Sequence, residues 1–583
     1  MNTTSNDFFK SNVLGHPAGL FVLFFTEMWE RFSFYGMRIL LVIFLTAAIG
    51  SDNPGFGMEI EEAAAVYGTY AMLLYLTPIL GGLIADKLLG YRWAVVIGAI
   101  IMTLGHAAMA METHFWVYVG LGLLVIGTGF FKPNMTSILS EMYKDVPEKK
   151  DGAYTIFYMG VNAGAFFGMM LCGYLGEKIG WAYGFGLAGI FMLLGTLQFW
   201  LAKPLFGSIG EVPSKLAMSE VEKVVDPLDN DTRNPFTMLD KILIGFSSVI
   251  GLGYAINDPL SKIANFDMFA FANTEILEGQ YIMVLFALAA FLYMVISRIL
   301  RYDPIVRDKM IAVIIFAFFT VFFWLSFEQG ASSLVLFARD SVDRTLVGDS
   351  AMIFKIVNTL LTIIPLVIIS YVLFLLGKQT WKKIPASNIV LIITFAGVWA
   401  VSLWMLGRDF MSDNTEIPVS WFSILNSFFI IAFASSVSKW WESKYNPTAA
   451  VKYGLGLIVM AAGFGFLAFG AYGIEAGIKV SMVWLILAYL FHTLGELCLS
   501  PVGLSYVSKL VPPRMIAFMF GMWYLAIAIG NKLAAVLGGQ IEHITNEYSL
   551  STFFLIFTIV PTVAGILVMT LNPLLKKLMH GVK

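Results

Sequence analysis

Repeated apolar stretches, each about 20 residues long, constrain this chain more than any other feature of its sequence, because a helix of that length crosses the hydrocarbon core of a bilayer. Apolar residues make up 58% of the 583 positions, charged residues make up 13%, and the mean hydropathy is +0.79. A soluble domain carries about 25% charged residues. We therefore expect an all-α polytopic membrane protein.

The apolar pattern predicts sixteen spans. They lie near 17–49, 63–88, 92–111, 114–140, 154–178, 182–206, 240–256, 279–299, 308–338, 351–377, 387–406, 417–440, 450–473, 479–507, 513–540 and 551–575. The net charge of −2 gives no reason to expect a nucleic-acid partner. Cys172 and Cys498 lie inside apolar stretches, so neither a disulfide framework nor a metal site is indicated.

Loops rich in Lys and Arg alternate with loops that lack them, as the positive-inside rule requires of loops on opposite sides of a membrane. Lys87 and Arg92 follow the second span, and Lys576 follows the last. The loops at 51–62 and 257–278 are acidic or nearly free of Lys and Arg. This alternation predicts that both termini are cytoplasmic.

The order of spans and polar segments divides the chain into six parts. We expect an N-terminal six-helix bundle at 1–206, a cytoplasmic linker at 207–239, an inserted helix pair at 240–299, the first helix of a C-terminal bundle at 300–340, a second inserted pair at 341–410, and the rest of the C-terminal bundle at 411–583.

Charged side chains inside the predicted spans are the first candidates for a functional site. A charge at the bilayer centre costs roughly 2.5–3.5 kcal/mol on insertion scales, so such residues are retained for a purpose. The charged residues in the interior of spans 1, 4, 9 and 14 are Glu27, Glu30, Arg31, Arg38, Lys132, Glu328 and Glu496.

These charges allow two interpretations. They could pair internally and hold helices together, which needs only single pairs. Because both signs are spread over four spans, a ring around a central space that accepts a zwitterionic solute fits them better. A buried carboxylate beside such a space can also exchange a proton, since desolvation disfavours its charged form.

Six motifs, in order along both halves, resemble those of the proton-dependent oligopeptide transporters, which belong to the major facilitator superfamily. They are EMWERFSFYG at 27–36, GGLIAD with GYR at 81–92, GTGFFKPN at 127–134, FYMGVNAG at 157–164, FWLSFEQ at 323–329 and GELCLSPVGLS at 495–505. The resemblance covers twelve core helices. The pair at 240–299 is similar to two extra helices of bacterial members, whereas the pair at 351–406 departs from the family, and we expect it to pack peripherally.

The resemblance implies roles for matching positions. Arg31 and Lys132 would meet a peptide carboxylate, and Glu496 would meet its amino group with Asn162 and Asn426. The full implied substrate-binding set is Arg31, Tyr35, Tyr75, Lys132, Asn162, Trp324, Asn426, Glu496, Ser500 and Trp523. Proton coupling and gating are expected of Glu27, Glu30, Arg38 and Glu328, with Arg38–Glu328 and Lys132–Glu496 as switching pairs.

Three departures from the family pattern bear on these roles. Phe34 stands where the family usually has a first tyrosine, and the segment around Asn426 lacks the usual following proline. Gly68 stands where animal members have a histidine used in proton transport, so coupling is expected to depend on carboxylates. His492, one turn before Glu496, could tune that carboxylate or be a packed neutral imidazole.

The sequence thus predicts a multi-pass symporter of the cell membrane that imports di- and tripeptides with protons, with no cofactor and no metal. Transport of nitrate, a drug or a modified amino acid on the same scaffold is the main alternative. A membrane enzyme is disfavoured because the cytoplasmic segments show no catalytic constellation. A peptide-sensing receptor without transport stays open.

Overall fold

The predicted spans form helices because hydrocarbon offers no partner for backbone polar groups, and a helix satisfies them internally. A computed structural model describes residues 11–146, 149–211, 234–412, 415–444, 446–473, 478–511 and 516–582. The side chains at 442, 501, 502, 504, 508 and 516–518 lie outside this description, as does most of the predicted linker.

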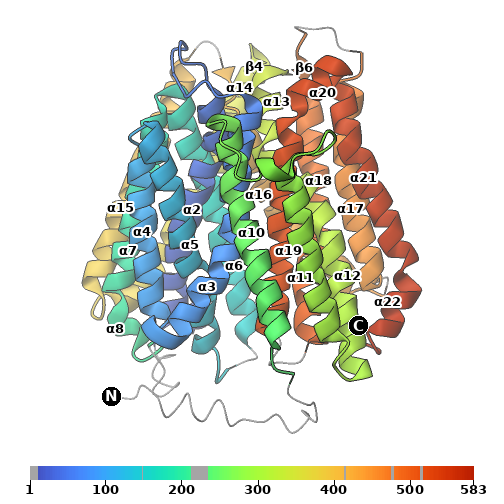
Figure 1. Ribbon diagram of the computed structural model, residues 1–583. Helices are drawn as coiled ribbons and strands as arrows, with labels where there is room; N and C mark the ends of the chain where they lie inside the picture. Colours follow the sequence, from blue (N-terminus) through green and yellow to red (C-terminus); the bar gives the residue numbers. More distant parts are fainter. Residues whose placement is uncertain are drawn as a thin grey trace.

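The first six long helices form one bundle, on the left in Figure 1. They are α2 (Ala18–Thr46), α3 (Ile60–Ile84), α4 (Tyr91–Met109), α5 (His114–Met142), α6 (Lys150–Lys178) and α7 (Trp181–Leu201). A π-helical turn, η1 (Ala85–Leu89), ends α3, and the short α8 (Lys203–Phe206) follows α7.

The second bundle, on the right in Figure 1, consists of α12 (Pro304–Phe327) and the helices from α16 onward. These are α16 (Trp421–Glu442), α17 (Ala449–Gly470), α18 (Met482–Leu510), α19 (Ile516–Gly539) and α21 (Leu550–Thr570), with the short α20 (Ile541–Glu547) and α22 (Asn572–Leu578). The two bundles meet where α3 packs on α19 and α6 packs on α16.

Each predicted span contains a long helix, and fifteen of the described helices are long and apolar enough to cross a membrane. The remaining long helix, α2, carries Glu27, Glu30, Arg31 and Arg38, and this charge sets it apart from the others. Nearly all of its side chains are buried inside the protein. A helix that other helices surround can keep charges that a lipid-facing helix could not.

The ninth span differs from the single helix expected at 308–338. Helix α12 ends at Phe327, a 3-10 turn η4 (Glu328–Ala331) follows, and α13 (Ser333–Asp340) continues the crossing. At the break, Gln329 Nε2 donates to the carbonyl oxygen of Leu325 in the preceding turn (3.1 Å) and to that of Ala534 in α19 (2.8 Å). The break places Glu328 at the end of a helix.

The first inserted pair, α10 (Met238–Ile263) and α11 (Gly279–Ile299), lies in front of both bundles in Figure 1 and is joined by a loop with the 3-10 turn η3 (Ala270–Ala272). The second pair, α14 (Asp349–Thr380) and α15 (Pro385–Met411), follows the first helix of the second bundle in sequence. It nevertheless packs on the first bundle, with Phe395 edge-on to Phe25 (5.5 Å between ring centroids) and Trp29 (5.4 Å). The pair therefore covers one side of α2.

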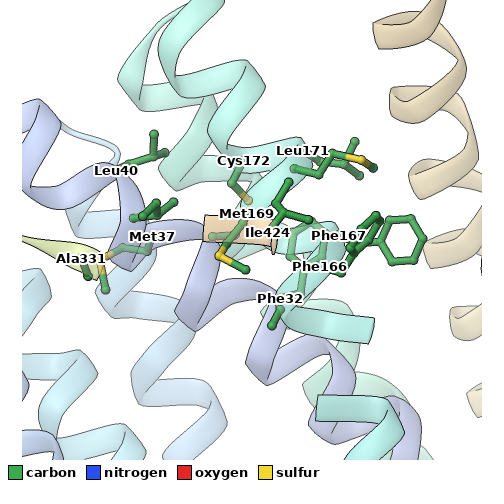
Figure 2. Packing of buried hydrophobic residues seen from close by; sticks show 14 of the residues in the cluster. Phe32, Met37, Leu40, Phe166, Phe167, Met169, Leu171, Cys172, Ala331 and Ile424 are labelled. Atoms are coloured by element: carbon green, nitrogen blue, oxygen red, sulfur yellow. The ribbon is translucent and has the colours of Figure 1, made fainter. Parts of the chain in front are cut away.

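Glycines bring α2 and α6 into direct backbone contact. A Cβ atom at Gly164 would lie 2.2 Å from the carbonyl oxygen of Met28, and one at Gly168 would lie 2.2 Å from that of Phe32. Small residues four positions apart allow this approach between membrane helices. Figure 2 shows the result, with Phe32 of α2 beside Phe166 and Phe167 of α6.

Three pairs of short strands also occur in the part of the chain that the structure describes, and none was expected from the sequence; β4 and β6 are labelled at the top of Figure 1. The pairs are β1 (Asn12–Val13) with β2 (His16–Pro17), β3 (Val342–Asp343) with β6 (Val480–Ser481), and β4 (Thr345–Leu346) with β5 (Thr415–Glu416). The last two pairs lie at the closed end described below.

The end that carries β3 to β6 is closed by contacts between the bundles. Glu177 of α6 accepts hydrogen bonds from the backbone N–H groups of Val419 (2.7 Å) and Ser420 (2.9 Å), just before α16. Arg339 of α13 donates to Thr46 at the end of α2 (2.7 Å). We call this the strand end; the predicted topology places it outside the cell.

Candidate functional site

The charged residues of α2 form a buried cluster. Arg31 Nε lies 2.8 Å from Glu27 Oε1 and 2.8 Å from Glu30 Oε2. The hydrogen bond goes to Glu27, so Glu30, which is fully buried, is held by charge without a described hydrogen bond. The three residues together carry a formal charge of −1, a charge that burial disfavours.

Lys132 of α5 brings that local charge to zero. It lies within electrostatic range of Glu30 and Glu27, and its Nζ atom is 4.6 Å from the ring centroid of Tyr75. An ammonium at this distance over an aromatic face is attracted to the ring. Lys132 is therefore held within the first bundle.

The second cluster crosses between the bundles. Arg38 of α2 forms an ion pair with Glu328 at the end of α12, the pairing expected from the sequence. Tyr67 of α3 donates its hydroxyl to Glu328 Oε2 (3.0 Å) and accepts from Arg38 Nε (2.9 Å). The break after Phe327 is what presents this carboxylate to the opposite bundle.

Phe34 lies between two arginines. Its ring centroid is 5.6 Å from the guanidinium carbon of Arg31 and 5.8 Å from that of Arg38. Where the resemblance leads one to expect a tyrosine, the ring face still supports both cations without a hydroxyl group.

A cavity of about 220 Å³ lies between the bundles. Six of the residues singled out from the sequence line it: Tyr35, Arg38, Asn162, Asn426, His492 and Glu496. Asn426 Nδ2 donates to Glu496 Oε2 (2.9 Å) and to Thr493 Oγ1 (3.1 Å), which orients the carboxylate.

Tyr35 joins the charged groups of both bundles. It lies within electrostatic range of Arg31, Arg38, Glu496 and Glu328. The cavity itself is lined by one cation, Arg38 of α2, and one carboxylate, Glu496 of α18. Such an arrangement can accept a solute that carries one charge of each sign.

The predicted pair Lys132–Glu496 is not formed in the part of the chain that the structure describes. Lys132 is directed to Tyr75, and the Glu496 carboxylate is held by Asn426. Each group has thus found a partner in its own bundle, and the two bundles meet through Arg38–Glu328 instead.

The aromatic expectations divide. Trp324 lies 6.3 Å from Tyr75 between ring centroids, and Tyr524 lies 6.4 Å from Tyr75. Trp523 is 4% exposed and packs edge-on to Tyr453 (6.5 Å), and none of the four residues Tyr75, Trp324, Trp523 and Tyr524 lines the cavity. One residue along a helix turns a side chain by about 100°, so Tyr524 lies beside Tyr75 while its neighbour Trp523 packs on Tyr453.

Two further residues depart from the expected substrate-binding set: Ser500 was expected in it, and Tyr489 was not. Ser500 does not line the cavity, and its buried hydroxyl has no described partner. Tyr489 does line it, and its hydroxyl contacts Ser423 Oγ (3.1 Å) and the Gly330 carbonyl (3.3 Å). Since Tyr489 precedes Glu496 by seven residues, two helical turns, its spacing could have identified it.

His492 is packed. It is 2% exposed and its ring centroid lies 4.3 Å from that of Phe464. Its ring also reaches the cavity wall, so it combines a packing contact with access to the site.

Comparisons with known proteins agree with one another. A model described as "POT family" matches residues 92–389 and 390–556. The chain is 30% identical over 558 residues, 93% of its length, to "Peptide transporter YePEPT" of Yersinia enterocolitica subsp. palearctica serotype O:3, of which it covers 91%. It is 28% identical over 596 residues to a "Di-/tripeptide transporter" of Lactococcus lactis subsp. cremoris, with 100% of this chain and 99% of the other covered.

A solved structure gives the same picture. A crystal structure of "peptide transporter POT in complex with sulfate" superposes with a TM-score of 0.72 at 26% identity, and all of both chains is covered.

Proposed function

The chain belongs to the POT family, and on that premise we propose that it is a symporter that imports di- and tripeptides with protons across the cell membrane. The observation that carries the proposal is the cavity between the bundles, with Arg38 on one wall and Glu496 on the other. A peptide without charged side chains has one carboxylate and one ammonium group, and this cavity offers a charged partner for each.

The peptide carboxylate is assigned to Arg31 of α2 and Lys132 of α5, which lie outside the cavity lining; Tyr35, which lines the cavity, is within electrostatic range of Arg31. Arg31 is buried, Lys132 is partly buried, and both are balanced by Glu27 and Glu30. Charge-assisted hydrogen bonds of this kind are about twice as strong as neutral ones. The peptide amino group is assigned to Glu496, which Asn426 already orients.

Charge balance couples the peptide to a proton. Glu27, Glu30, Arg31 and Lys132 sum to zero, so a bound peptide carboxylate leaves one unbalanced negative charge in a buried place. A proton on Glu27 or Glu30 restores neutrality. Binding of the peptide and uptake of a proton therefore favour each other, and the proton gradient supplies the energy with no cofactor.

The Arg38–Glu328 pair links the proton to movement of the bundles. Protonation of Glu328 removes one charge of the pair that joins α2 to α12. The closed contact weakens, and the two bundles can rock about the central site, as in other transporters with alternating access.

Reconstituted vesicles test the proposal directly. Under an inward proton gradient, dialanine and trialanine should accumulate, whereas free alanine and nitrate should not. Vesicles without a gradient and the surface variant Glu542→Gln, which removes an exposed carboxylate on α20, serve as controls. Accumulation of nitrate or alanine in preference to the peptides would replace the peptide assignment with another solute, and saturable binding without accumulation would indicate a receptor.

A further inference from the structure

A buried ion pair outside the cavity joins three parts of the molecule at the strand end. Lys532 of α19 contacts Asp258 of α10. Lys532 is 3% exposed and Asp258 is fully buried. A buried charge pair in a membrane protein is expensive, so its presence needs a reason. It belongs neither to the cavity nor to the charged clusters of α2.

Lys532 also reaches the first bundle. Its Nζ atom donates to Thr69 Oγ1 (3.0 Å) and to the carbonyl oxygen of Ala65 (3.4 Å), both on α3. Lys532 belongs to the second bundle, so these bonds cross the line along which the bundles must separate. One lysine thus holds both α3 and α10.

Helix α10 is attached to α3 at this end. Thr69 Oγ1 donates to the Ala255 carbonyl (2.9 Å), and Lys262 Nζ lies 3.2 Å from Glu61 Oε1. Through these contacts the upper part of α10 is fixed to the first bundle. Asp258 is then a carboxylate that the first bundle presents to a lysine of the second.

The backbones meet closely at the same place. A Cβ atom at Gly68 of α3 would lie 2.5 Å from Ala535 Cβ and 3.2 Å from Lys532 Cδ. The absence of a side chain at Gly68 therefore leaves room for the lysine stem to pass between the helices. At Gly68, where the resemblance leads one to expect a histidine in animal members, the side chain of Lys532 from the opposite bundle occupies the space.

From this arrangement we infer that Lys532 and Asp258 form an ionic latch that holds the strand end closed. The inserted helix α10 then takes part in opening and closing this end. The inference rests on the proposed alternating access. When the bundles part at this end, Lys532 must leave Asp258, Thr69 and Ala65 together. Asp258 keeps a cation after opening, because Lys262 Nζ lies 3.3 Å from its Oδ1 atom on the same helix.

Distances between spin labels at the strand end test the latch without any peptide. Labels at Asp52→Cys, in the exposed loop before α3, and at His543→Cys, on the exposed face of α20, report separation of the two bundles. The double variant Lys532→Met with Asp258→Asn removes both charges, so neither is left stranded. Lys241→Met removes an exposed charge from the same α10 helix and is the matched control.

The double variant should show a second, longer distance, with the ratio of open to closed molecules raised at least about tenfold, since close charge pairs couple by about 1.5 kcal/mol or more and about 1.4 kcal/mol is a factor of ten. Lys241→Met should leave the distribution unchanged. If the double variant does not fold, the milder Thr69→Ala, which removes one acceptor of Lys532, should give a smaller shift in the same direction. An unchanged distribution in a folded variant would show that the pair is only packing and would overturn the latch.

Peptide uptake by the same variants keeps the two proposals apart. Suppose that the double variant shows the longer label distance while the wild type fails to take up dialanine. The latch would then stand and the peptide assignment would be rejected. Suppose instead that the wild type takes up dialanine normally while the double variant shows no change in label distance. The peptide assignment would then stand and the latch would be rejected.

Discussion

Replacing Glu328 by glutamine removes the proton-accepting group of the pair that crosses between the bundles. In the wild type, Glu328 accepts from Arg38 and from the Tyr67 hydroxyl. Glutamine keeps an amide oxygen at this place, so the contacts can persist as hydrogen bonds to a neutral group. Bonds to charged groups contribute about 1.5–3 kcal/mol and neutral ones about 0.5–1.5 kcal/mol.

The difference, about 1–2 kcal/mol, corresponds to a change of about 5- to 30-fold in the ratio of closed to open molecules. This shift changes rates, but it does not abolish movement. The amide cannot take up a proton, so the pH gradient no longer acts on the pair. We therefore expect Glu328→Gln to lose uptake driven by a pH gradient and to keep exchange of peptide across the membrane.

The assay compares two fluxes in the same vesicles: accumulation of dialanine under an inward proton gradient, and counterflow with dialanine on both sides at equal pH. Glu542→Gln, an exposed carboxylate on α20, should be normal in both. Glu328→Asp keeps a titratable group and should retain part of the driven uptake. Full gradient-driven accumulation by Glu328→Gln would remove Glu328 from the coupling mechanism.

Three further outcomes are expected. Lys132→Ala should weaken the binding of dipeptides, measured by competition for uptake, by about 1.5–3 kcal/mol. The binding of analogues without the terminal carboxylate should weaken much less, and equal losses for both ligands would contradict the carboxylate assignment. Gly164→Ala should lower the melting temperature, since the new Cβ would meet the Met28 carbonyl at 2.2 Å and such overpacking costs about 1–3 kcal/mol. Gly122→Ala, with open space around it, is the control, and equal melting of both variants would refute close packing of α2 on α6. Burial disfavours the charged form of Glu416, but Arg344 and Lys178 outweigh it and hold its pKa below the usual value. Glu416→Gln should therefore destabilise the protein at neutral pH, and the difference in stability from the wild type should vanish as pH falls through that lowered pKa. A difference in stability that is independent of pH would exclude the ion pairs as its cause.

The inserted helix pairs illustrate how far a sequence argument reaches. Their existence and their even number follow from hydropathy and loop charge. Their partners do not, since α15 follows the first helix of the second bundle yet packs against Phe25 and Trp29 of the first. Lys532 is likewise a charge inside a predicted span, but its partner Asp258 is 274 positions away, and only the structure shows that the two lie together.

The sequence by itself determined which segments are helices, because a backbone in hydrocarbon has to satisfy its own polar groups and apolar length then reports each crossing. It also marked the charged residues inside the spans as candidates for a site, since a charge in hydrocarbon is costly to keep. The tertiary structure alone decided which charges meet. Three features depend on how each helix is rotated and shifted against its neighbours: whether Lys132 turns to Tyr75 or to Glu496, whether Tyr524 or Trp523 lies beside Tyr75, and the break of α12 after Phe327. That rotation is set by packing between residues far apart in the chain, which no local pattern contains.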